Sequence, residues 1–132
     1  MAESRKSILT ATFGPYVKQD PALIASYGGE ENIKKMITFS IKQANELGFD
    51  VADIALNPQD QEGSVRQLED KLRSQSFDGL LIGWGLRGNK DYTPFFEAAV
   101  NTAKDVAPQT KLLFGNAPDD LVNTLRRTFA GS

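Results

Sequence analysis

Residues 77–89, FDGLLIGWGLRGN, constrain the fold of this chain more than any other segment. Residues 80–82 form an unbroken apolar run, and Gly83, Gly85 and Gly88 follow it. A short run that is apolar on both faces is typical of a strand in a parallel sheet that helices cover on both sides. The segment therefore predicts a buried parallel strand over residues 79–84, in which Trp84 belongs to the core or faces a helix, followed by a glycine-rich loop.

The rest of the chain alternates between strand-like and helix-like segments. Further strands are expected over residues 7–12, 49–56 and 111–114. A clear amphipathic helix is expected between Glu30 and Gly48, because its apolar residues recur at helical spacing.

Three further helix starts are predicted from capping patterns. Ser64 and Gln67 form a capping box for the second long helix. Thr93 followed by Pro94 is typical of an N-cap with proline at the first helical position. Asn116 is expected to cap the last helix, since it lies between the fourth strand and an amphipathic segment.

Strands that alternate with helices predict parallel pairing and right-handed crossovers. The most economical arrangement is an α/β three-layer sandwich of the flavodoxin-like (Rossmann-like) kind, with a four-stranded parallel sheet in the order 2-1-3-4. This order places the most apolar strand inside the sheet and the second strand, with Asp50 and Asp53, at an edge. No linker or repeat interrupts the pattern, so residues 1–132 are expected to form one domain.

The fourth strand would be an exposed edge in this arrangement. Five strands are usual in sheets of this type, and proteins commonly cover exposed edges. We therefore expect a second copy of the chain to cover this edge or an adjacent helix face, giving a homodimer.

Residues 13–29 form a long connection after the first strand, broken by glycine and proline pairs. Such long connections are often functional. Part of this segment, residues 21–26, is expected to form a helical turn.

The composition excludes several kinds of chemistry. The chain has no cysteine and no histidine, so disulfides, thiolate chemistry and the commonest metal ligands are absent. No metal site is expected, and no catalytic residue is assigned.

Charge and hydropathy limit the partners. The net charge of −2 and the pI of about 5.1 argue against nucleic-acid binding, which normally requires a basic face. No apolar window is long enough to span a membrane, and the N-terminus lacks the apolar core of a signal peptide. We expect a soluble cytoplasmic protein that binds neither nucleic acid nor membrane.

The candidate site follows from the strand order. Open α/β sheets bind ligands beyond the carboxyl ends of their strands, where the winding direction reverses. Here that crevice lies between the loops after the first and third strands. The predicted binding residues are Thr12, Gly14, Tyr16, Gly85, Arg87, Asn89 and Asn116.

Arg87 suggests that the ligand is an anion. A guanidinium can bind a carboxylate or phosphate through two hydrogen bonds, and the amides of residues 85–89 can add donors. Structural interpretations are also open: Arg87 as a surface residue, Tyr16 as a hydrophobic anchor and Asn116 as a helix cap.

Two cofactor patterns occur in weak form. Residues 83–88 match GxGxxG, but the next helix is expected only at Thr93, and no acidic residue ends the following strand. Residues 10–14 resemble a hydroxyl-rich flavodoxin phosphate loop, but Pro15 follows where a helix should begin. We expect no cofactor, with flavin or nicotinamide dinucleotide as alternatives.

Three hypotheses about function remain. The first is a small-molecule binding protein, or a cofactor-independent enzyme, that acts on an anionic organic ligand in the crevice. The second is an interaction or subunit module without its own ligand. The third is a nucleotide- or flavin-binding protein.

Overall fold

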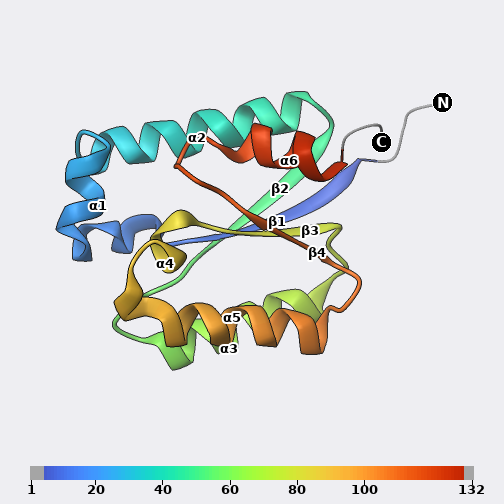
Figure 1. Cartoon of the computed structure of the whole chain (residues 1–132). Helices are drawn as coiled ribbons and strands as arrows, with labels where there is room; N and C mark the ends of the chain where they lie inside the picture. Colours follow the sequence, from blue (N-terminus) through green and yellow to red (C-terminus); the bar gives the residue numbers. More distant parts are fainter. Residues whose placement is uncertain (1–4, 130–132) are drawn as a thin grey trace.

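The structure, a computed structural model, describes residues 5–129 of the chain (Figure 1). Its strands are β1 (Lys6–Thr12), β2 (Phe49–Ala55), β3 (Gly79–Ile82) and β4 (Lys111–Phe114). They pair in parallel in the order β2-β1-β3-β4. The predicted order and the flavodoxin-like class are therefore confirmed, with β2 at an edge as expected.

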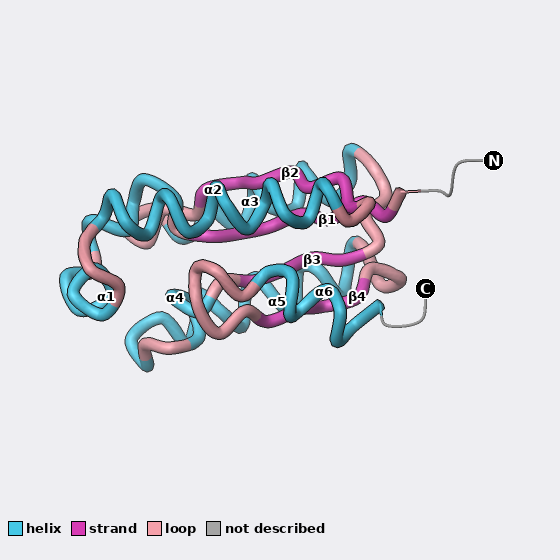
Figure 2. Tube along the Cα trace, turned by 90° about the horizontal axis from the view of Figure 1, so that it is seen from above, coloured by secondary structure: helices cyan, strands magenta, loops and turns pink. Residues whose placement is uncertain are grey.

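Helices cover both faces of the sheet. The helices are α1 (Pro21–Ser26), α2 (Glu30–Glu46), α3 (Gln61–Ser74), α4 (Trp84–Arg87), α5 (Thr93–Val106) and α6 (Leu121–Phe129), with the 3-10 helices η1 (Gly14–Gln19) and η2 (Lys90–Tyr92). Helices α2 and α6 lie on one face and α3 and α5 on the other, which gives three layers (Figures 1 and 2). Among the described helices, none is both long and apolar enough to cross a membrane.

Each face of the sheet has its own core. On the α3 and α5 face, Leu9, Leu80 and Ile82 are fully buried. On the α2 and α6 face, Ile8 and Leu81 pack in a separate cluster. Burial on both faces accounts for the continuous apolar run in β3, because each of its residues has a helix to contact.

The central strand ends earlier than predicted. Strand β3 stops at Ile82, and α4 begins at Trp84 directly after Gly83. Trp84 is 37% exposed, so its expected place in the core is wrong. Leu86, one half-turn further along α4, is buried instead at 1% exposure.

Two capping predictions are also wrong. Helix α3 begins three residues before Ser64, and Asp60 caps it by accepting a hydrogen bond from the Gly63 amide at 3.1 Å. Ser64 lies inside the helix, where its hydroxyl accepts a hydrogen bond from the backbone N–H of Asn57 at 2.8 Å. This contact fixes the β2–α3 loop. Tyr92, one residue before Thr93, is the N-cap of α5.

Asn116 is not the cap of α6. The helix begins at Leu121, and the Asp120 carbonyl accepts from the Thr124 amide in its first turn. The backbone N–H of Asn116 donates to the Asp120 carboxylate at 3.1 Å, so Asn116 belongs to the loop before the helix.

Residues 13–29 contain more helical structure than the sequence predicts. They contain η1 as well as α1, and α1 confirms the helical turn expected at 21–26. We refer to residues 13–29 as the cover segment, for the position described below.

Candidate ligand-binding site

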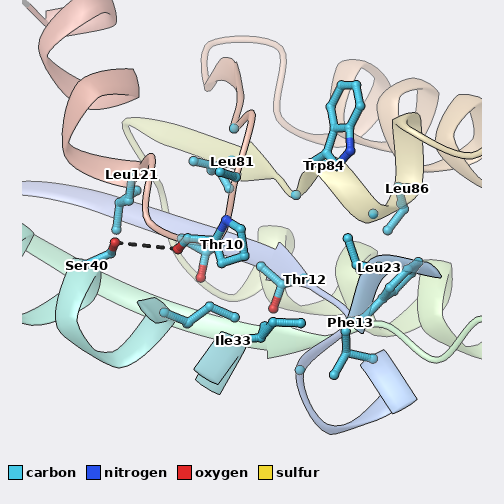
Figure 3. Close-up of a pocket in the computed structure, with 18 of the residues that line it drawn as sticks. Thr10, Thr12, Phe13, Leu23, Ile33, Ser40, Leu81, Trp84, Leu86 and Leu121 are labelled. Carbon is cyan, nitrogen blue, oxygen red and sulfur yellow. Dashed lines mark hydrogen bonds between the residues drawn. The ribbon is translucent and has the colours of Figure 1, made fainter. Parts of the chain in front are cut away.

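A cavity of about 80 Å³ lies at the carboxyl ends of β1 and β3, between the sheet and α2 (Figure 3). None of the described residues that line it is charged, and we refer to it as the apolar cavity. Its lining comes from β1, the cover segment, α2, β3, α4, the β4–α6 loop and the start of α6. These residues are Thr10, Thr12, Phe13, Gly14, Val17, Leu23, Ile33, Ile37, Ser40, Ile41, Leu81, Gly83, Trp84, Gly85, Leu86, Gly115, Ala117, Pro118 and Leu121.

A second cavity, of about 290 Å³, lies beside it toward the β2 edge of the sheet. Six residues line both cavities: Thr12, Gly14, Val17, Ile33, Ile37 and Ile41. The second cavity also contains Glu30, Glu31, Lys34 and Asp53, and we refer to it as the charged cavity. The two cavities therefore adjoin and differ in the chemistry of their walls.

The alternation of β1 builds the floor shared by the cavities. Ile8, Thr10 and Thr12 point toward the α2 side, because successive strand residues face opposite sides of a sheet. The two threonines are shorter than the large apolar residues elsewhere in the sheet core. On α2, Ile33 and Ile37 lie one turn apart and form the opposite wall.

Ser40 closes the far end of the apolar cavity. It is 1% exposed and donates a hydrogen bond to the Pro118 carbonyl at 3.5 Å, drawn as a dashed line in Figure 3. This contact joins α2 to the β4–α6 loop.

Asp53 is held against β1 by a threonine. The parallel register places Asp53 beside Thr10, whose hydroxyl donates to Asp53 Oδ1 at 2.5 Å. The Thr12 hydroxyl is buried and makes no hydrogen bond of normal geometry within the described residues. Thr12 nevertheless lies near enough to Asp53 to favour the ionised carboxyl.

Burial raises the pKa of the Asp53 carboxyl above its ordinary value of 3.8, and the hydroxyls of Thr10 and Thr12 oppose this effect. Desolvation has this direction because it penalises the charged form. Asp53 as a whole residue is exposed at the sheet edge, so water moderates the size of the effect.

The cover segment closes the cavities at the strand ends. Phe13, Val17 and Leu23 line the apolar cavity. Gly14 at one end of the segment has φ 54°, and Gly28 at the other has φ 79°. Glycine adopts such left-handed conformations without steric cost, so these residues turn the chain across the cavity and back.

The end of the cover segment reaches the β4–α6 loop. The Tyr27 hydroxyl donates to the Asn116 carbonyl at 3.4 Å. Phe13, at the other end, packs edge-on against Tyr92, with ring centroids 5.4 Å apart.

Two glycines of the GxGxxG match have packing roles. A Cβ on Gly85 would lie 2.7 Å from the Phe13 ring, and one on Gly88 would lie 2.5 Å from the Trp84 ring. A helix does begin directly after Gly83, contrary to the expectation that none starts before Thr93, but it has only four residues. The glycines thus admit aromatic rings close to the backbone.

The structure brings three of the predicted site residues together. Thr12, Gly14 and Gly85 line the apolar cavity. Tyr16 is half-buried and packs against the core. The side chain of Asn89 accepts a hydrogen bond from the Asp91 amide at 2.9 Å and caps η2.

Arg87 and Asn116 contact each other outside both cavities. Arg87 Nη2 donates to Asn116 Oδ1 at 2.6 Å and to the Gly115 carbonyl at 3.4 Å. Its guanidinium lies 4.7 Å from the centroid of the Trp84 ring and 5.8 Å from that of Phe114. Arg87 therefore ties α4 to the β4–α6 loop.

Sequence reasoning did not include Thr10, Ser40 and Asp53 among the binding residues. A signal was present for each: Thr10 shares a strand face with Thr12, and Ser40 interrupts the apolar stripe of α2. Asp53 lies two residues after Val51 and therefore shares its strand face.

No group of three or more acidic side chains within residues 5–129 is placed to hold a metal ion. No protein-family model matches the chain, and a search of curated proteins gives no match.

Proposed function

We propose that this protein binds a small organic molecule whose apolar part occupies the apolar cavity. The observation that carries the proposal is the position of this cavity, at the strand ends where open α/β sheets bind ligands. Together with the adjoining charged cavity of about 290 Å³, it provides the apolar walls and few polar groups that are typical of small-molecule sites.

The cover segment supports binding rather than simple packing. It places Phe13, Val17 and Leu23 over the cavity and is joined to the β4–α6 loop through Tyr27. A segment that turns at Gly14 and Gly28 can open and close with changes at a few backbone positions.

The anionic ligand expected from the sequence remains a second form of this proposal. Arg87 would hold it, and the contact with Asn116 would have to give way. The residues that line the two cavities favour an apolar ligand over an anion, because Asp53, Glu30 and Glu31 contribute negative charge there.

A catalytic function is the third form. Asp53 is an ionisable side chain hydrogen-bonded to Thr10, which lines the apolar cavity. A carboxyl in this position can act as a proton acceptor.

A thermal-shift screen tests the proposal, using apolar small molecules, carboxylates, phosphate esters, nucleotides and flavins. A ligand at 100 times its dissociation constant stabilises the folded state by about 2.7 kcal/mol, which raises the Tm of a domain of this size by about 10 °C. We expect apolar compounds to give such shifts.

Two phenylalanine substitutions locate the binding. Ala117→Phe places a ring at the wall of the apolar cavity, and we expect it to abolish the shift. Ala98→Phe is the matched control, because Ala98 is half-buried on α5 in the opposite helix layer. Shifts that survive Ala117→Phe, or no hit in any class, would contradict the proposal; loss of anion binding in Arg87→Ala would favour the anionic form.

A further inference from the structure

The charged cavity carries an excess of negative charge. Its walls contain three carboxylates, from Glu30, Glu31 and Asp53, and one ammonium, from Lys34. The ion pairs found within residues 5–129 join Arg5 to Asp50 and Arg73 to Glu69. Lys34 therefore does not neutralise these carboxylates by direct contact.

The two glutamates have a structural explanation. Glu30 and Glu31 lie in the first turn of α2, where negative side chains are stabilised by the helix dipole. Asp53 lies in a strand and has no such explanation. It is also held in place, since Thr10 donates to one of its carboxylate oxygens at 2.5 Å.

Thr12 supplies a second polar group at the same place. It lines both cavities, and its buried hydroxyl lacks a hydrogen-bond partner of normal geometry in the described residues. Thr12 favours the ionised form of the nearby Asp53 carboxyl, which can accept the hydroxyl proton, so the lone pairs of Thr12 Oγ1 are left to accept a hydrogen bond from a ligand donor.

The combination points to the chemistry of the ligand. We infer that the protein binds an amphipathic amine, with its apolar part in the apolar cavity and its ammonium group donating to the Asp53 carboxylate and Thr12 Oγ1. This inference rests on the proposed function and specifies its ligand class. An ammonium has three donors and no acceptor, which matches a carboxylate beside a hydroxyl lone pair.

The same geometry disfavours the other head groups. A carboxylate or phosphate would meet Asp53, Glu30 and Glu31 as like charges. A neutral hydroxyl could bond to Thr12 but would gain no charge attraction from Asp53. Affinity should therefore follow the order amine, alcohol, acid for a constant apolar part.

The test uses n-hexylamine, 1-hexanol and hexanoate, which share one alkyl chain, at pH 7 by isothermal titration calorimetry. We expect the amine to bind about fivefold more tightly than the alcohol, since hydrogen bonds to charged groups are worth about 1 kcal/mol more than neutral ones. Hexanoate should bind more weakly than the alcohol.

Asp53→Asn separates the carboxylate from the rest of the site. The side-chain amide of the variant keeps an oxygen that can accept the hydrogen bond from the Thr10 hydroxyl, so 1-hexanol should bind the variant as it binds the wild type. n-Hexylamine should lose its higher affinity, because the carboxylate charge is gone. Asp50→Asn is the matched control, because it removes the same charge from the opposite face of the same strand, where Asp50 pairs with Arg5. Unchanged alcohol binding also verifies that Asp53→Asn is folded.

Several outcomes would overturn the amine inference: equal binding of all three compounds, tightest binding of hexanoate, no amine binding, or an amine affinity that Asp53→Asn leaves unchanged. If the alcohol or acid binds and Ala117→Phe abolishes that binding, the proposed function stands without the amine. If the broad screen gives no ligand sensitive to Ala117→Phe, the proposed function itself fails.

Discussion

At the scale of single residues, Asp53 stands out because burial disfavours the charged form of its carboxyl. Its carboxyl is held by Thr10, and desolvation raises its pKa above 3.8. A carboxyl with a raised pKa binds its proton more tightly in the folded state than in the unfolded state. Its contribution to stability is therefore complete below pH 3.8 and is lost as the pH rises through the raised value.

Asp53→Asn should accordingly increase the free energy of unfolding at neutral pH, because the neutral amide avoids the desolvation of a charge. The gain over the wild-type protein should shrink as the pH falls toward 3.8, where the wild-type carboxyl becomes protonated. Urea denaturation of both proteins between pH 3.5 and pH 8 measures this, with Asp50→Asn as the control. A variant that is less stable than the wild type at neutral pH would contradict the expectation.

At the scale of elements, the cover segment rests on α4 through one close contact. The Phe13 ring occupies the space that a Cβ on Gly85 would need, at 2.7 Å. Phe13 is 4% exposed, and its edge-on contact with Tyr92 leaves little room for the ring to move. The glycine at position 85 is thus required by the packing of two elements.

Gly85→Ala should lower the free energy of unfolding by about 1–3 kcal/mol, the usual cost of overpacking a core. Gly83→Ala is the control: its φ of −69° suits any residue, and its nearest contact would be Thr12 Cγ2 at an ordinary 3.5 Å. We expect Gly83→Ala to stay within about 0.5 kcal/mol of the wild type. Equal effects of the two substitutions in urea denaturation would show that the Phe13 contact is unimportant.

The elements were largely predictable from the sequence, but their ends were not. The continuous apolar run at 80–82 predicted a strand, because a strand buried on both faces is apolar throughout. The apolar stripe of α2 predicted a helix, because a helix buried on one face has apolar residues at helical spacing. Helix α4 was not predicted because glycine in and beside it is unfavourable in helices. Its stability comes from tertiary contacts of Leu86 and Trp84. Capping patterns failed at Ser64 because its hydroxyl bonds to the β2–α3 loop instead.

The candidate site was predictable only in part. The strand order located the crevice, and Thr12, Gly14 and Gly85 do line the apolar cavity. Nothing in the spacing of Arg87 and Asn116 indicated that they contact each other, because that pairing depends on how two loops meet. Asp53 joins Thr10 only through the register of two strands that are far apart in sequence.

At the scale of the whole molecule, the sheet ends at β4. Strand β4 pairs with β3, and its other side has no partner strand within residues 5–129. Such an edge presents backbone donors and acceptors to solvent. Phe39 of α2 and Leu47, the residue directly after it, are also exposed, at 58% and 50%, so a contact through this helix face is an alternative.

We therefore predict a homodimer, with a mass twice the 14.5 kDa of the chain, in size-exclusion chromatography with light scattering. Hydrogen exchange at increasing protein concentration should show added protection of β4 if the edge is the interface. Added protection of α2 around Phe39 and Leu47 would favour the helix face instead. A monomeric mass at every concentration would contradict the dimer.

The wall shared by the two cavities has a practical consequence for chemical probes. Because Ile33, Ile37 and Thr12 line both spaces, two small fragments bound one in each would contact the same side chains. Joining such fragments by a short tether makes the second association intramolecular, so the affinity of the joined compound can exceed that of either fragment by orders of magnitude. Weak hits found separately for the two cavities are thus starting points for one tight-binding inhibitor or sensor ligand.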